Sequence, residues 1–308
     1  MEPFKEKLAY LSLCVSLLSD KIREIEFDRS SGASQLARSA LGVLSLFVQT
    51  SKTRAATAFV ADFSEVGRRL FAARPNMAPI QNLVAQIVYE VNALGESDLV
   101  SVRKFAVSRI DDLAKESEVT VKESAGWAAT LIGDSDCLAT CSYSSTICET
   151  FRIAKQQRKR FKVFIAESRS DDDKFRCGEA LAAFLKSIDV PAEVFRDNEI
   201  YRYVPKAESV LEGADSVLFD GSVINGSPTC ELAVNAKECG IPFYSVCETS
   251  KMNTLSYLGR NVELKEGFDL VPSNLITGII TERGILGANE IVEIMKLNSR
   301  FYEIFCIK

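Results

Sequence analysis

The chain has 308 residues, more than one minimal core needs and fewer than three ordinary domains use, so we expect two domains. Its 42 acidic and 37 basic residues give a net charge of −5, which argues against broad contact with a nucleic-acid backbone, and we expect no direct nucleic-acid binding. The chain has no histidine, which excludes Ser-His-Asp, Cys-His and His-zinc chemistries.

The distribution of apolar residues and cysteines indicates a cytoplasmic protein. No apolar run reaches the roughly 18 residues that a membrane span requires. The first residues carry mixed charge where a signal peptide would have a basic stretch followed by an apolar one. The nine cysteines lie singly within apolar runs and form no C-x-x-C pair, so we interpret most of them as reduced core residues. We expect no membrane contact, no metal and no cofactor.

The first half of the chain has a helical pattern. Apolar residues recur at spacings of three and four, as in Ala40, Leu44 and Phe47, and no convincing alternating strand is present. We therefore predict a helical N-terminal domain, residues 1–130, with five or six helices. A helix over Val119–Ile132 would span the boundary and contact both halves.

After Gly133 short apolar runs alternate with amphipathic segments, which is typical of βα units that form a parallel sheet. The predicted strands are Cys137–Cys141, Lys162–Ala166, Ala192–Phe195, Ser216–Phe219, Phe243–Val246 and Gly278–Thr281. The predicted helices between them are Ser144–Gln157, Asp173–Ser187 and Cys230–Cys239. The fold class is therefore α/β, with the helical N-terminal domain followed by a Rossmann-like parallel-sheet C-terminal domain, residues 131–308.

Parallel sheets bind ligands at the carboxyl ends of their strands. We therefore expect the strand ends after Cys141, Ala166 and Val246 to meet the loop through Asn225 at one concave site. The segment Gly213–Asp215 is expected to precede the strand that begins near Ser216, as a loop between two elements.

Two of the expected loops carry residues suited to a ligand. A hydroxyl-rich turn, Thr140–Thr146, follows the first strand, and its helix N-terminus suits a phosphate, although an ordinary Ser/Thr N-cap explains the same residues. Cys141 and Ser142 have no histidine to activate them, so nucleophilic catalysis would need an acidic base or a helix dipole. Glu167 and Arg169 follow the second strand and precede an acidic run, which a solvated loop at a helix start also explains.

Several further motifs occur together over almost the whole chain. They are Gly32–Ser34, Arg74-Pro75 with Asn82, Gly213–Asp215, Asp220–Asn225, Ile241–Lys251 and Phe268–Gly284. In combination they resemble the α, β and δ regulatory subunits of translation initiation factor 2B and their relatives, the ribose-1,5-bisphosphate and methylthioribose-1-phosphate isomerases. The resemblance to the regulatory subunits implies self-association and binding of initiation factor 2 through the α/β domain.

The resemblance to the isomerases identifies three catalytic candidates. In the isomerases a strand-end cysteine acts with the aspartate of a Gly-Ala-Asp loop, which corresponds to Asp215 here. Counting back without gaps from Glu167 places the cysteine position on Ser142, with Cys141 at the preceding histidine position. A shift of one residue would restore the cysteine, but it would turn the strand's side chains to the other face of the sheet.

Two departures from the isomerase pattern favour a regulatory subunit. Gly226 stands where the isomerases have a phosphate-holding lysine, and Ser31 stands where they have an arginine that grips phosphate. Arg29 lies two residues from that position as a substitute. By contrast, residues 140–163 resemble the β-type regulatory subunits.

We interpret the chain as a non-catalytic regulatory subunit that binds initiation factor 2, with its α subunit as the candidate partner, and a small phosphorylated ligand such as a nucleotide or sugar phosphate. The alternative is an aldose–ketose isomerase of the ribose-1,5-bisphosphate isomerase type, in which Asp215 is the acid/base and Cys141 or Ser142 shuttles the proton. A regulatory module that binds the ligand without turnover is a third reading. The candidate ligand-binding residues are Gly32, Ala33, Arg74, Ser142, Ser144, Glu167, Arg169, Asp215, Asn225 and Lys251.

The C-terminal tail, Phe301–Cys306, is apolar and costly to leave in water. We therefore expect a homo-oligomer, a dimer or higher, that associates through apolar faces of the α/β domain near this tail.

Overall fold

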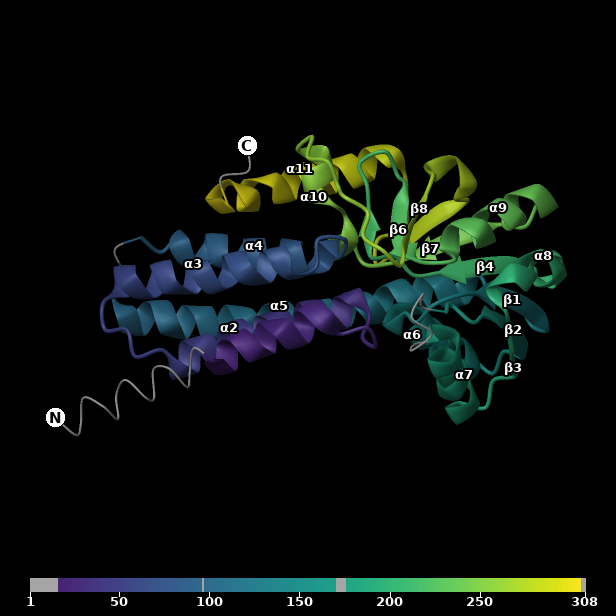
Figure 1. Ribbon diagram of the computed structural model, residues 1–308, viewed down its shortest axis with the longest axis horizontal. Helices are drawn as coiled ribbons and strands as arrows, with labels where there is room; N and C mark the ends of the chain where they lie inside the picture. The colour runs from purple at the N-terminus through teal and green to yellow at the C-terminus, as the bar shows by residue number, and fades with distance from the viewer. Residues whose placement is uncertain (1–15, 96, 170–175, 306–308) are drawn as a thin grey trace.

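The computed structural model describes residues 16–95, 97–169 and 176–305. A helical bundle forms one end of the elongated molecule, and a sheet covered by helices forms the other (Figure 1). None of the helices in these ranges is long and apolar enough to cross a membrane.

Five helices build the helical half within the described residues. They are a helix over residues 16–27, α2 (Ala33–Thr50), α3 (Ala56–Ala73), α4 (Ala78–Asn92) and α5 (Leu99–Thr130). Their core holds a cluster of the Phe47, Phe59 and Phe63 rings, whose centroids lie 5.4 to 6.2 Å apart. Gly67 lets α3 approach α4 closely, because a Cβ at this position would overlap Val88. The predicted helical character of this half is confirmed.

A seven-stranded sheet in the order β10-β9-β7-β4-β1-β2-β3 forms the centre of the other half. Its strands are β1 (Asp136–Thr140), β2 (Phe161–Ala166), β3 (Ala192–Phe195), β4 (Ser209–Glu212), β7 (Phe243–Val246), β9 (Gly278–Thr281) and β10 (Gly284–Leu286). All neighbouring pairs are parallel except β9 and β10. The predicted mostly parallel α/β architecture is therefore confirmed.

Helices cover both faces of this sheet. The end of α5, α6 (Ser145–Gln156) and α7 (Cys177–Ser187) pack on one face, against residues such as Leu138 and Ile165. α9 (Thr229–Cys239) packs on the other face, against residues such as Val210. The strand order reverses between β1 and β4, and such a reversal is where sheets of this kind form a ligand crevice.

A second, three-stranded antiparallel sheet corrects one of the predicted strands. It contains β5 (Ser216–Val217), β6 (Val223–Gly226) and β8 (Phe268–Val271). The prediction that Ser216–Phe219 is a strand of the main sheet is therefore wrong. The strand of the main sheet in this part of the chain is β4, which ends at Glu212. As a result Gly213–Asp215 follows a strand of the main sheet instead of only preceding one, which brings Asp215 to its carboxyl edge.

The C-terminal helix α11 (Ala288–Tyr302) starts at the sheet edge and ends on the helical half, where it packs on α4 (Figure 1). Tyr302 is fully buried, and its ring meets Phe71 of α3 edge to face at 5.5 Å. Phe305 stacks on the same Phe71 at 4.5 Å. Phe301 and Tyr302 are thus buried by their own chain, whereas Ile304 and Phe305 are only half-buried, so less apolar surface is left here than the sequence suggested; Cys306 lies outside the described residues.

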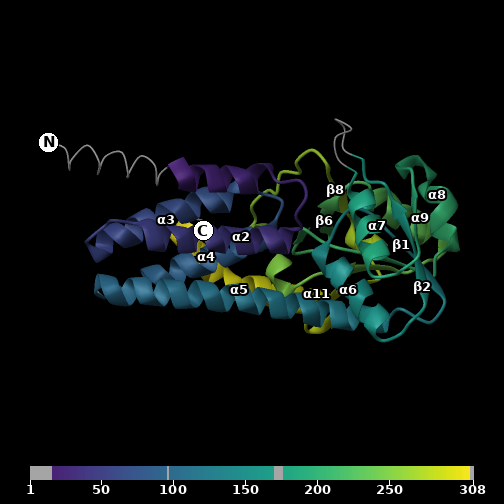
Figure 2. The same cartoon turned by 90° about the horizontal axis from the view of Figure 1, so that it is seen from below.

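Helix α5 also joins the two halves, as predicted for Val119–Ile132. It contacts α2 and α4 in the bundle and continues to α6 and β9 of the sheet domain (Figure 2). Both α5 and α11 therefore contact the helical half and the sheet half.

Candidate functional site

The loops after four strands of the main sheet and after β6 meet at one edge. Ser142 follows β1 and Asp215 follows β4, and these strands are parallel neighbours. Gly213 lies against Ser144, because a Cβ on Gly213 would stand 2.6 Å from the Ser144 Oγ. A Cβ on Gly226 would stand 3.6 Å from the Ser142 Cβ. The structure therefore brings Ser142, Ser144, Asp215 and the loop after Asn225 to the carboxyl edge of the sheet where the strand order reverses, and we call this place the crevice.

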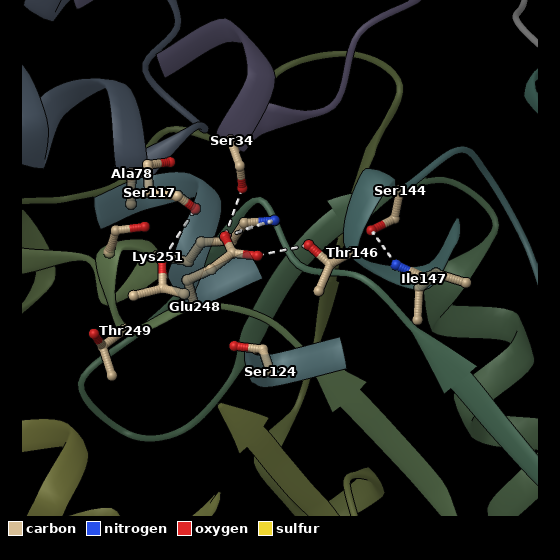
Figure 3. Close-up of polar contacts among 12 residues, drawn as sticks. Ser34, Ala78, Ser117, Ser124, Ser144, Thr146, Ile147, Glu248, Thr249 and Lys251 are labelled. Carbon is tan, nitrogen blue, oxygen red and sulfur yellow. Dashed lines mark hydrogen bonds and ion pairs between the residues drawn. The ribbon is translucent and has the colours of Figure 1, made fainter. Parts of the chain in front are cut away.

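Two helix N-termini converge on a buried carboxylate in this crevice. Gly32 precedes α2 and lies beside the start of α6, since a Cβ on it would stand 3.5 Å from the Ser145 amide nitrogen. Ser34 of α2 donates to Glu248 Oε2 at 2.5 Å, and Thr146 of α6 donates to Glu248 Oε1 at 2.6 Å (Figure 3). Glu248 is only 1% exposed. A carboxylate is favourable here because helix N-termini attract negative charge.

Two cations flank this carboxylate and Asp215. Lys251 is buried, and its Nζ lies 3.9 Å from Glu248 Oε2. Desolvation raises the pKa of Asp215 to about 6, against the opposing attraction of Lys251 and Arg74. Arg74 Nη1 donates to the backbone carbonyls of Glu26 and Asp28, and burial lowers the pKa of its guanidinium. Asp215 is therefore a carboxyl group that titrates nearer to neutral pH than an ordinary aspartate.

Cys141 and Ser142, the two candidates for the nucleophile position, have different surroundings. Cys141 is buried in the core, with its Sγ 3.3 Å from Thr229 Oγ1. Burial, followed by the charge of Glu212, raises its pKa well above the usual value for a thiol. Ser142 has a positive φ of 55°, and its backbone N–H donates to Ser168 Oγ at 2.6 Å. Burial thus disfavours the thiolate form of Cys141, and the Ser142 hydroxyl lies beside Gly226.

Glu212 is a buried acid that the sequence analysis did not identify. It ends β4, is fully buried, and accepts the backbone N–H of Cys141. Burial raises its pKa from 4.5 to about 8, and its Oε2 has no hydrogen-bond partner among the described residues. Burial therefore favours the protonated form of Glu212 at neutral pH.

Replacing Glu212 with glutamine is expected to change how stability depends on pH. Between pH 4.5 and about 8 the unfolded state releases this proton and the folded state keeps it, so wild-type stability falls as pH rises. The decline per ionising group reaches at most about 1.4 kcal/mol per pH unit. Glutamine does not titrate, so the variant should gain stability relative to wild type from pH 5 to pH 8. Urea unfolding at several pH values measures the difference, and parallel curves would contradict it.

The remaining predicted ligand residues fall into three groups. Ser144 caps α6 by accepting the Ile147 N–H at 3.3 Å, as the ordinary N-cap reading requires. Asn225 faces inward and donates to Thr229 Oγ1 at 2.9 Å. The backbone N–H of Glu167 donates to the Phe195 carbonyl, and that of Arg169 donates to Asp197 Oδ2 at 3.1 Å. The acidic run after Arg169 lies outside the described residues.

Sequence reasoning missed Glu248, Thr146 and Ser34 as site residues. The signal for Glu248 was present, because it follows the predicted strand Phe243–Val246 at its carboxyl end. Within residues 16–95, 97–169 and 176–305 no cluster of acids and cysteines is arranged to hold a metal ion. Lys251, Arg74 and the neighbouring hydroxyls are groups that suit a phosphate.

Together these features define an α/β protein with a helical N-terminal half and a polar crevice at the carboxyl edge of its sheet. A family model described as the Initiation factor 2 subunit family matches residues 29–267, and the chain belongs to this family, as its motifs predicted.

Relatives of two kinds are similar to the chain. A translation initiation factor eIF-2B subunit 2-like protein of Pyrococcus abyssi is 33% identical over 288 residues, covering 88% of this chain and 98% of that protein. Ribose 1,5-bisphosphate isomerase of Thermococcus kodakarensis is 25% identical over 305 residues, covering 91% of this chain and 92% of that enzyme. A chain of the tetrameric eIF2B-beta2-delta2 complex of C. thermophilum shares the fold, with a TM-score of 0.75 and 19% identity over 92% of this chain and 95% of that one.

Proposed function

We propose that the protein is a non-catalytic subunit of the initiation factor 2B type. In this proposal it self-associates in the cytoplasm, binds initiation factor 2 through its α subunit and takes a small phosphorylated ligand in the crevice. It is divided into a helical domain, residues 1–130, and a Rossmann-like domain, residues 131–308. The family, the Pyrococcus abyssi relative and the assembly of the tetrameric complex support it.

The placement of Cys141 and Ser142 is the observation that carries the non-catalytic part. An aldose–ketose isomerase must move a proton between adjacent carbons, which needs a base of suitable pKa at the substrate. Cys141, the thiol directly after β1, is buried against Thr229 and has a raised pKa. Ser142 presents a hydroxyl, which is too weak an acid or base to replace a thiolate without an activating partner.

Glu248 also supports binding without turnover. Its carboxylate already occupies the N-termini of α2 and α6 and lies near Lys251, so part of the positive potential that a bisphosphate would use is balanced by the protein itself. A ligand with a single phosphate fits the remaining charge of Arg74 and Lys251 better than one with two.

The second candidate is a sugar-phosphate isomerase. Asp215 favours it, because a pKa of about 6 suits a general acid/base near neutral pH. The similarity to the Thermococcus kodakarensis enzyme points the same way.

Sedimentation velocity on the purified chain, alone and with the α subunit of initiation factor 2, tests the proposal. We expect the chain to sediment as a dimer or larger species at micromolar concentration and to co-sediment with the α subunit. An unrelated acidic protein of similar size serves as the control for charge. A monomer that does not co-sediment with the α subunit would contradict the proposed function.

A further inference from the structure

The last turn of α11 is linked by hydrogen bonds to the turn that carries Lys251, through the buried side-chain amide of Asn82. Tyr302 is fully buried, and its hydroxyl donates to Asn82 Oδ1 of α4 at 2.6 Å. Thr254 Oγ1 donates to the same oxygen at 3.1 Å. The side-chain orientation of Asn82 is therefore held by the C-terminal helix and by α10 (Thr254–Tyr257).

The other end of the Asn82 amide holds the turn that carries Lys251. Its Nδ2 donates to the carbonyl of Ser250 at 2.6 Å and to that of Met252 at 2.8 Å. These carbonyls lie on either side of Lys251, at the 3-10 turn Thr249–Lys251, which we call the Lys251 turn. One side-chain amide thus fixes the backbone on both sides of the buried cation.

The Lys251 turn is not packed on all sides. A groove of about 190 Å³ lies behind it, lined by Asn82, Thr249 and Ser250 together with residues of α5, α11 and the β9–β10 turn. Glu282 accepts the Thr249 N–H at 3.0 Å and anchors the start of the turn. The Asn82 amide, together with the Asn253 N–H that donates to the Val217 carbonyl at 2.7 Å, holds the part of the turn around Lys251 beside this groove.

We propose that Tyr302 is a positioning residue for Lys251, acting through Asn82, so that docking of the C-terminal helix on the helical half sets the affinity of the crevice for phosphate. The proposal rests on the proposed function in one respect, that the crevice takes a phosphorylated ligand. A partner that displaced the end of α11 would then weaken ligand binding at a site that it does not touch.

The test compares Tyr302→Phe with Tyr89→Phe in the full chain. Both changes remove one phenolic hydroxyl from the contact between α4 and α11, and the Tyr89 ring meets Phe301 edge to face at 5.5 Å. The Tyr89 hydroxyl makes no hydrogen bond within the part of the chain that the structure describes. Hydrogen–deuterium exchange of residues 250–254 reports on the Lys251 turn, and titration with inorganic phosphate reports on the crevice.

We expect Tyr302→Phe to raise exchange at residues 250–254 and to weaken phosphate binding, each by about fivefold, the size expected for one lost hydrogen bond. Exchange in α2 should stay at the wild-type level, and Tyr89→Phe should match wild type in both measurements. Unchanged exchange at 250–254, an equal rise over the whole chain, or an equal effect of Tyr89→Phe would overturn the role of Tyr302. Failure of wild type to bind phosphate would refute the proposed ligand instead, and the exchange comparison would then decide the role of Tyr302 by itself.

Discussion

Replacing Glu248 with glutamine is expected to lower the free energy of unfolding by about 3 kcal/mol or more, the loss typical of breaking a buried ion pair. Lys251 is 3% exposed and lies 3.9 Å from Glu248 Oε2, so the substitution leaves a buried cation without its closest counter-charge. The hydroxyls of Ser34 and Thr146 also lose a charged acceptor. Urea unfolding followed by circular dichroism measures the change.

Two variants separate charge burial from a general effect of the substitution. Glu263→Gln makes the same chemical change at an ion pair with Lys265 whose members are both well exposed, and it should cost less than about 1 kcal/mol. Lys251→Met combined with Glu248→Gln removes both charges and should recover much of the lost stability. If Glu248→Gln were as mild as Glu263→Gln, the buried pair would not be an ion pair in solution.

The sequence predicted most of the main sheet because its strands are short apolar runs between amphipathic helices. β3, β7 and β9 have the predicted bounds. β4 was missed because Ser209–Glu212 begins with a serine and ends in an acid, and a glutamate is rarely buried without a charged partner. Burial raises the pKa of Glu212 to about 8, so the buried group is a neutral acid, which a residue pattern does not reveal.

The candidate site was predicted in its strand-end loops and missed in its long-range contacts. Parallel topology places Ser142, after β1, at the carboxyl edge, whereas Asp215 reaches the same edge through β4, a strand that the sequence did not predict. The Glu248 contacts join residues 214 and 102 positions apart, and the Tyr302 contact with Asn82 spans 220 positions. Such contacts depend on how the helical half packs on the sheet, and no local periodicity encodes that packing.

The purified protein is expected to show no measurable isomerisation of ribose-1,5-bisphosphate or methylthioribose-1-phosphate. A positioned general base contributes roughly 10²- to 10⁴-fold to such a reaction, and Ser142 cannot act as one. The lysine that holds phosphate in the isomerases is replaced by Gly226, and one charge-assisted hydrogen bond contributes about 1.5–3 kcal/mol. A coupled assay for the ketose product measures the turnover.

The double variant Ser142→Cys, Gly226→Lys should tighten binding of the sugar phosphate more than it restores turnover. A side chain at Gly226 is sterically acceptable, because its Cβ would stand 3.6 Å from the Ser142 Cβ, which is an ordinary contact. The new ammonium would face the crevice where phosphate binds, so we expect affinity to rise by about tenfold. Ser142→Cys with Gly226→Met matches the length of the side chain without its charge and should not bind more tightly than wild type. Robust turnover by the unmodified protein, abolished by Asp215→Asn, would instead establish the isomerase, with Asp215 as its acid/base.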